Sequence, residues 1–185
     1  MTEQAKLDIL AFRTFRLLRQ NQHVLVTAES CTAGLIAATL ARVPGISNCL
    51  AGSLVVYQID SKKAWLDLPA EVFSEENAVS STIAELMATQ ALAKTPHATI
   101  SLSITGHLGP DAPIHLDGVA WAGLATRYSA VLSRHLLLHP KSTATLSDEQ
   151  HLSIRHLRQQ DAVSQGLSFL CDQLAKNDSL GSTAL

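Results

Sequence analysis

Apolar and polar residues follow two different periods along the chain, and the change of period predicts where helices and strands lie. Spacings of three and four are typical of an amphipathic helix, and they recur between residues 5 and 20. The positions that carry this spacing are Leu7, Leu10, Ala11, Thr14, Phe15 and Leu18. An Ala-rich helix is expected at 32–42, stopped by Pro44-Gly45, and a long helix at 148–174. A further helix begins near Ser80, where Thr82 and Glu85 match a capping box.

Short apolar runs predict five strands between these helices, at residues 23–28, 49–57, 98–106, 118–126 and 130–138. The early strands are separated by segments long enough for covering helices, whereas the last two follow one another across a tight link. This order predicts a three-layer α/β/α fold with a mixed central sheet. We expect a single domain over residues 1–175, followed by a flexible tail at 176–185.

Composition narrows the class of protein. Hydrophobic residues make up 46% of the 185 residues and charged residues 16%, which favours a packed core over disorder. The net charge of −2 and the lack of a strong Lys/Arg cluster argue against a nucleic-acid partner. Cys31, Cys49 and Cys171 are odd in number and widely spaced, which fits a reduced, cytoplasmic chain without disulfides. No metal-ligand spacing, signal peptide or membrane span is found in the sequence.

The turn between the first strand and the second helix carries four candidate functional residues in a row, Glu29, Ser30, Cys31 and Thr32. In α/β sheets, ligands bind where strands end and helices begin, and backbone N–H groups at a helix start can hold a phosphate or an oxyanion. The simpler explanation is that Ser30 or Thr32 caps the helix and that Glu29 is solvated. Both explanations stay open from this turn alone.

Two further strand ends carry polar residues or glycines. The segment VVYQIDSKK (55–63) brings Tyr57, Asp60, Lys62 and Lys63, and SITGHLGPDAP (103–113) brings Thr105, Gly106, Gly109 and Pro110. Separately, these residues read as a strand terminus, surface lysines and an ordinary turn. Together, the three strand ends predict one crevice in which glycines let the backbone approach a ligand.

The same segments carry a resemblance to a known family. TAESCTAG, VVYQIDSKK, NAVSSTIAELMA and SITGHLGPDAP…DGVAWAGLAT resemble, in order and spacing, the successive motifs of the CinA-like competence/damage-inducible C-terminal domain family. The likeness runs from about Leu7 to Leu174. Enzymatic members of that family are nicotinamide mononucleotide deamidases. The resemblance implies an α/β/α domain that hydrolyses the carboxamide of this nucleotide to the acid and ammonia, without metal or cofactor. We also expect a homo-oligomer, with no nucleic-acid or membrane partner.

The resemblance also implies a role for each matched residue. Ser30 falls on the nucleophile and Lys62 on the base, and a lysine can act as a base near neutral pH only if its pKa is lowered. Thr32 and the amides at the helix start would stabilise the oxyanion, and Tyr57 would orient the substrate. The residues expected on the substrate side are Glu29, Cys31, Gly34, Thr105, Gly106, Gly109 and Arg155, of which Arg155 would meet the phosphate.

Several positions depart from the family pattern. Ala33 replaces a glycine, Ile59 stands near the expected base, and His107 and Leu108 add bulk to the loop after the third strand. His151 stands where an arginine is usual. These changes leave a second hypothesis open, a catalytically weak or inactive relative that binds a nucleotide or another small molecule.

Overall fold

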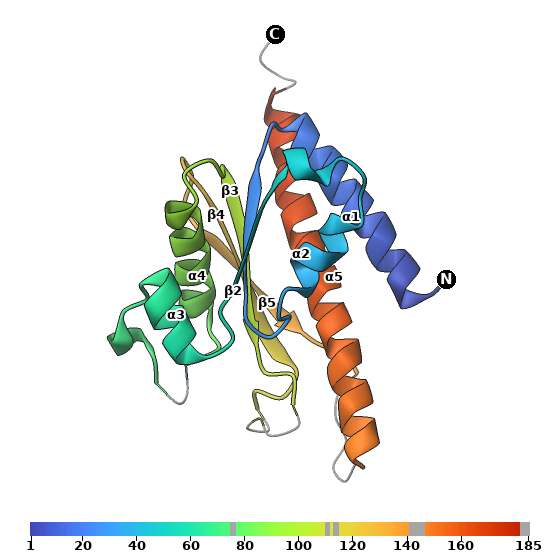
Figure 1. The fold of residues 1–185 in the computed structure, drawn as a ribbon, viewed down its shortest axis with the longest axis vertical. Coiled ribbons are helices and arrows are strands. Elements are labelled where there is room, and N and C mark those ends of the chain that lie inside the picture. The colour runs from blue at the N-terminus through green and yellow to red at the C-terminus, as the bar shows by residue number, and fades with distance from the viewer. Residues whose placement is uncertain (75–76, 110–111, 113–114, 141–146, 182–185) are drawn as a thin grey trace.

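A five-stranded mixed sheet forms the centre of the computed structural model, which describes residues 1–74, 77–109, 112, 115–140 and 147–181 (Figure 1). Its strands lie in the order β2-β1-β3-β4-β5. They are β1 (Leu25–Glu29), β2 (Leu50–Val55), β3 (Ile100–Gly106), β4 (Val119–Thr126) and β5 (Leu132–Leu137). The β1 strand is parallel to both of its neighbours, β2 and β3, whereas β4 is antiparallel to both of its neighbours, β3 and β5. The predicted mixed sheet is therefore confirmed.

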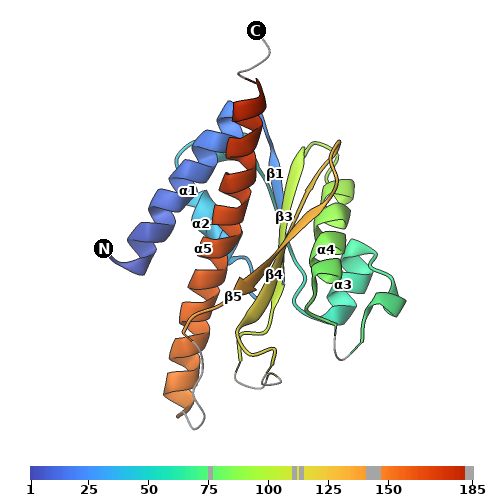
Figure 2. The same cartoon turned by 180° about the vertical axis from the view of Figure 1, so that it is seen from behind.

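Helices cover both faces of this sheet and make three layers. One face carries α1 (Glu3–Gln20), α2 (Leu35–Ala41) and α5 (Asp148–Gly181), and the other carries α3 (Ile59–Leu66) and α4 (Ser81–Lys94), as the two opposite views show (Figures 1 and 2). Two single 3₁₀ turns lie at Ile46–Asn48 and Ala70–Val72. None of the helices in the described part of the chain is long and apolar enough to cross a membrane.

The core consists of two apolar clusters, one on each side of the sheet. The stripe predicted on α1 is buried at Leu7, Ala11, Phe15 and Leu18, and it packs on α5. Burying a large apolar side chain stabilises the fold by roughly 1.5–3 kcal/mol. The apolar stripe predicted from the sequence therefore places α1 against α5, in the helical layer on one face of the sheet.

Two helix boundaries and one helix cap differ from the predictions. The α2 helix begins at Leu35 rather than residue 32, because Ala33 and Gly34 have φ angles of 52° and 94° and form a turn. The cap of α4 is Ser80, whose Oγ accepts the amide hydrogen of Ile83, so the predicted capping box at Thr82 was wrong.

At the other end of the chain, α5 continues to Gly181, where a tail was expected from residue 176. No proline or glycine interrupts residues 167–180, so nothing in this stretch ends the helix earlier. Residues 182–185 lie outside the described part of the chain.

The α3 helix was not predicted at all. Its eight residues, Ile59–Leu66, have no clear apolar stripe, and only Lys62 and Leu66 are buried among them. This helix matters for the site because it turns Lys62 inward and leaves its neighbour Lys63 paired with Asp60 near the surface.

Candidate active site

A cavity of about 510 Å³ lies at the edge of the sheet where the parallel strands β1, β2 and β3 end. Ser30 follows β1, Tyr57 follows β2, and Thr105 lies at the end of β3. The lining residues are Ser30, Cys31, Tyr57, Ile59, Lys62, Ala78, Val79, Thr105, Gly106, His107, Leu108, Gly109, Ala112 and Arg155. The three strand ends singled out from the sequence thus line one space.

Ser30 and Lys62 form a hydrogen-bonded pair in this cavity. Nζ of Lys62 lies 2.9 Å from Oγ of Ser30, and the two residues are only 4% and 6% exposed. The carbonyl oxygen of Tyr57 accepts from both groups, at 3.4 Å each. Burial lowers the pKa of Lys62 below its ordinary value of 10.5, because the protein interior disfavours the charged ammonium. A lysine with a lowered pKa beside a serine hydroxyl is a typical arrangement for activating that hydroxyl.

Glu29 has a structural role in the turn, instead of the contact with a substrate that was expected from the sequence. Its side chain is fully buried, and its carboxylate accepts the amide hydrogens of Gly34, Ile36 and Ala37, each at 3.0 Å. Oε2 also accepts from the hydroxyl of Thr32 at 2.7 Å. The backbone N–H groups at the start of α2 therefore have a buried carboxylate as their acceptor.

This arrangement corrects three of the expected roles. The hydroxyl of Thr32 and the first amides of α2 are occupied by Glu29, so they do not serve an oxyanion. Gly34 adopts the left-handed conformation at the N-cap of α2. Glu29, Thr32 and Gly34 are absent from the residues that line the cavity.

Arg155 of α5 bridges two walls of the cavity. Its Nη1 donates to the carbonyl oxygen of Gly109 at 2.6 Å, and its Nη2 donates to the hydroxyl of Tyr57. The Tyr57 side chain is half exposed, whereas its main-chain carbonyl contacts the buried Ser30–Lys62 pair. Tyr57 therefore holds the pair through its backbone and holds Arg155 through its side chain.

Thr105 is one of the residues that line the cavity. The residue is 1% exposed, and its hydroxyl makes no hydrogen bond to any residue that the structure describes. Gly106 and Gly109 have packing reasons to be glycine. A Cβ at Gly106 would lie 2.6 Å from the Cβ of Ala120, and Gly109 has a φ of +71° with Asp117 Oδ1 2.7 Å from the place of its Cβ.

The bulky residues noted in the sequence also line the cavity. His107 is partly buried, and burial, followed by the charges of Lys62 and His115, lowers its pKa below the ordinary 6.5. Leu108 is 3% exposed and belongs to the apolar core as well. Ile59 adds an apolar surface beside Lys62, and burial raises the pKa of the Cys31 thiol to about 12, so the thiol stays protonated.

A smaller hollow of about 290 Å³ adjoins the cavity beyond Arg155. It is lined by Asp148, His151, Leu152 and Arg155. His151 therefore lies near Arg155 but outside the main cavity. Among the described residues, no group of three or more His, Cys, Asp or Glu side chains could hold a metal ion.

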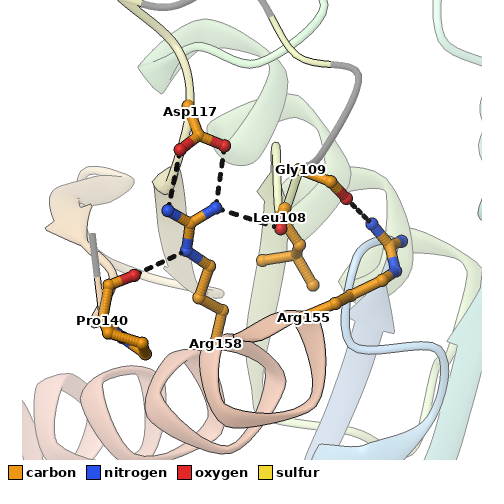
Figure 3. Close-up of polar contacts among 6 residues, drawn as sticks. All are labelled: Leu108, Gly109, Asp117, Pro140, Arg155 and Arg158. Atoms are coloured by element: carbon orange, nitrogen blue, oxygen red, sulfur yellow. Dashed lines mark hydrogen bonds and ion pairs between the residues drawn. The ribbon is translucent and has the colours of Figure 1, made fainter. Parts of the chain in front are cut away.

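Three residues that matter for the site were missed in the sequence. Arg158 donates from Nη1 to the carbonyl oxygen of Leu108 at 3.1 Å and pairs with both carboxylate oxygens of Asp117 (Figure 3). Gln159 donates from Nε2 to the carbonyl oxygen of Cys31 at 3.2 Å. With Arg155, Arg158 and Gln159 make α5 the element that anchors the loops around the cavity. The spacing of Arg158 and Gln159, three and four residues from Arg155, was the available signal, because it places them on one face of a helix.

The fold and the Ser–Lys pair define an α/β protein with a cavity at the carboxyl ends of its parallel strands. The chain belongs to the CinA C-terminal domain family, whose model matches residues 8–170. Among named relatives, it is 34% identical over 140 residues to a protein of Streptococcus pneumoniae strain JJA that is named as competence-damage inducible, covering 75% of this chain and 32% of that protein. It is 40% identical over 104 residues to a CinA-like protein of Cytophaga hutchinsonii, covering 56% of this chain and 25% of that protein. The chain thus spans about a third or less of the length of these relatives.

Solved structures agree on the fold. The competence/damage inducible protein CihA from Agrobacterium tumefaciens superposes with a TM-score of 0.76 at 27% identity, covering 92% of this chain and 96% of that one. A CinA superfamily protein from Klebsiella pneumoniae 700603 gives a TM-score of 0.77 at 23% identity, covering 92% and 98%. At 23% identity, the likeness to the Klebsiella protein is one of fold alone.

Proposed function

We propose that this protein is an amide hydrolase that converts nicotinamide mononucleotide to nicotinate mononucleotide and ammonia. The observation that carries the proposal is the buried hydrogen bond of 2.9 Å between Nζ of Lys62 and Oγ of Ser30. A serine hydroxyl is a weak nucleophile without a base, and among the described residues in hydrogen-bond contact with Ser30, Lys62 is the one that can take its proton.

The reaction proceeds in two halves. Neutral Lys62 takes the proton of Ser30 as Oγ attacks the carboxamide carbon, and the ammonium of Lys62 then returns that proton to the leaving nitrogen. Ammonia departs and leaves an ester on Ser30. Water, deprotonated by Lys62, attacks the ester carbon; the proton returns to Oγ and the carboxylic acid is released.

We assign the oxyanion contact to the amide N–H of Cys31. This amide directly follows the nucleophile, and it donates to no acceptor among the described residues. The amide of the residue after a serine nucleophile serves this purpose in other hydrolases. Removing one oxyanion donor costs roughly 3–4 kcal/mol of transition-state stabilisation in well-studied enzymes.

The size and polarity of the cavity support a nucleotide as substrate. Small-molecule sites commonly measure about 300–1,000 Å³, and the cavity here, at about 510 Å³, lies within that range. Arg155 places a guanidinium at its wall, where a phosphate can be bound with charge-assisted hydrogen bonds. The hydroxyl of Thr105 remains available for the ribose or the amide.

A second candidate function is nucleotide binding without turnover. Ile59 and His107 favour it, because they add an apolar surface and a bulky ring to the cavity that holds the Ser–Lys pair. In that case the cavity would bind the mononucleotide while the amide stayed out of reach of Ser30.

The test measures ammonia release from nicotinamide mononucleotide by the purified protein. We expect turnover that Ser30→Ala and Lys62→Ala abolish, while Lys63→Ala, the neighbouring lysine near the surface, keeps it. Binding of the mononucleotide by calorimetry without ammonia release would favour the second candidate. Equal losses in the two lysine variants would refute Lys62 as the base.

A further inference from the structure

Arg158 is a buried cation that binds one residue of the cavity lining, Leu108, and two residues outside it, Asp117 and Pro140. It is 1% exposed, and its Nη1 and Nη2 pair with the two carboxylate oxygens of Asp117 at 2.7 and 2.8 Å. Nη1 also donates to the carbonyl oxygen of Leu108, and Nε donates to that of Pro140 at 2.9 Å (Figure 3). Removing a charge from water is costly, so an arginine in this position needs all of these partners.

Arg155 and Arg158 hold two successive carbonyl groups of the same loop. Arg158 binds the carbonyl of Leu108 from inside the fold, and Arg155 binds the carbonyl of Gly109 at the cavity (Figure 3). The two arginines are three residues apart on α5, so they project from neighbouring positions of one helix face. The loop of residues 106–109 is thus fixed at two adjacent points by one rigid element.

Gly109 brings the backbone of this loop close to the Arg158–Asp117 ion pair. Gly109 lies so near the ion pair that a Cβ there would be 2.7 Å from Oδ1 of Asp117 and 2.9 Å from Nη1 of Arg158. The loop backbone therefore packs directly on the Arg158–Asp117 pair. Any shift of that pair moves the carbonyl of Gly109, which is the anchor of Arg155.

We infer that the Arg158–Asp117 pair is a positioning element that sets the substrate-binding wall of the cavity. It acts through the 106–109 loop on Arg155, the residue proposed to meet the phosphate, and so it controls substrate binding more than the chemistry at Ser30. The Ser30–Lys62 pair makes no direct contact with Arg158 or Asp117; it is held by the main-chain carbonyl of Tyr57, whose side-chain hydroxyl binds Arg155. This inference rests on the proposed function for its kinetic readout.

Arg127 provides a matched control at the other end of the strands, away from the cavity. It follows β4 and donates to the carbonyl oxygens of the α4–β3 connection and the end of α4, namely those of Leu92, Thr95, Pro96 and Ala98. Arg127→Lys removes similar arginine-to-carbonyl bonds, and none of the partners described for Arg127 lines the cavity. This variant therefore distinguishes a general loss of stability from a loss of positioning of the 106–109 loop.

The experiment compares Arg158→Lys, Asp117→Asn and Arg127→Lys, each checked for folding by circular dichroism. Lysine keeps the charge of Arg158 but cannot pair in two-pronged fashion with a carboxylate. We expect the first two variants to raise KM for nicotinamide mononucleotide by about tenfold or more and to leave kcat within about threefold. Arg127→Lys should leave both constants at the wild-type values. An equal rise of KM in Arg127→Lys, or a fall of kcat with unchanged KM, would overturn the inference.

Hydrogen–deuterium exchange makes the result independent of the proposed function. The amide of His107 donates to the carbonyl of Val119 at 2.8 Å, so its exchange reports on the loop. We expect faster exchange at residues 106–109 in Arg158→Lys and Asp117→Asn than in Arg127→Lys. A wild-type protein that releases no ammonia would refute the proposed function alone. Wild-type exchange rates in both Arg158→Lys and Asp117→Asn would refute the positioning role, whatever the activity.

Discussion

The carboxylate of Glu29 accepts the hydroxyl hydrogen of Thr32 at 2.7 Å, and this bond closes the turn that presents Ser30. The same carboxylate accepts three amide hydrogens at the start of α2, and it accepts the hydroxyls of Thr27 and Ser53 at 3.3 and 3.2 Å. Two polar residues of this turn, Glu29 and Thr32, therefore hold the turn in shape, although one capping residue would be enough to start the helix. Ser30 is left free to face the cavity.

Replacing Glu29 by glutamine should destabilise the protein strongly. Glutamine keeps one oxygen acceptor, but it places an NH₂ group against N–H donors of α2 and removes the charge that strengthens these bonds. We expect the free energy of unfolding to fall by roughly 2–4 kcal/mol, as measured by urea denaturation. Ser53→Ala, which removes one of the bonds to Glu29, should cost only about 1 kcal/mol. A Glu29→Gln protein as stable as the wild type would show that the carboxylate is not the cap.

The pH dependence of activity should follow the ionisation of Lys62. Burial lowers its pKa below 10.5, and the neutral amine is the active base, so kcat/KM should rise with pH, with the midpoint of the rise below 10.5. The ascending limb of the pH profile of kcat/KM measures this pKa. A profile that falls with rising pH over the same range would contradict the assignment.

Lys62→Arg tests the same point by another route. Arginine keeps the positive charge and a donor to Ser30, but it does not lose its proton in proteins. We expect a loss of about 10²–10⁴ in kcat, the usual contribution of a general base. Lys63→Ala serves as the control and should keep the wild-type profile, because Lys63 pairs with Asp60 near the surface.

The fold was predictable because its signals are local. The apolar stripe of α1 and the short apolar runs of the strands report directly on which face is buried. The α3 helix was missed because it is short and buries only Lys62 and Leu66, and a lysine gives no apolar signal. The start of α2 was misplaced because the turn at Ala33 and Gly34 needs positive φ angles, which an Ala-rich sequence does not reveal.

The site was predictable only in part, for a different reason. Ser30, Lys62, Thr105 and Arg155 lie at strand ends or in matched motifs, and all of them line the cavity. The contacts that fix the cavity wall join residues distant in sequence, as with Arg158, which donates to the carbonyl of Leu108 across 50 residues. No periodicity reports such a contact. The expected substrate role of Glu29 failed because a carboxylate that caps a helix from the preceding strand looks, in sequence, like one that binds a ligand.

Thr105→Val should weaken substrate binding without disturbing the fold. Valine has nearly the same shape and suits a β-strand, and the hydroxyl of Thr105 has no partner among the described residues that would be left unpaired. A lost hydrogen bond to a neutral group is worth about 0.5–1.5 kcal/mol, so KM should rise about two- to tenfold. Steady-state kinetics with nicotinamide mononucleotide measure this change. Thr105→Ser, which keeps the hydroxyl, should bind as the wild type does, and unchanged KM in the valine variant would remove Thr105 from the site.

His107 and Leu108 differ in whether their side chains can be replaced without destabilising the protein. Leu108 is 3% exposed and packs in the core, so Leu108→Ala would cost about 2–5 kcal/mol of stability and would confuse any measurement of binding. The backbone of His107 is fixed by the bond from its amide to Val119 and by the bond that its carbonyl accepts from Gly118 at 3.0 Å. The imidazole can therefore be replaced alone, without moving the loop.

His107→Ala should lower KM for nicotinamide mononucleotide and leave the pH profile unchanged. The side chain lines the cavity, and burial keeps its pKa below 6.5, so at pH 7 to 8 it is a neutral ring that takes up space without adding charge. Removing it should improve binding by up to about tenfold, which corresponds to about 1.4 kcal/mol. Steady-state kinetics between about pH 5 and 9 measure both quantities, and His97→Ala, on the α4–β3 connection, is the control. Loss of activity in His107→Ala, together with loss of a pH step below 6.5, would instead place the imidazole in the chemistry. A KM equal to that of the wild type would mean that the substrate does not reach this side of the cavity.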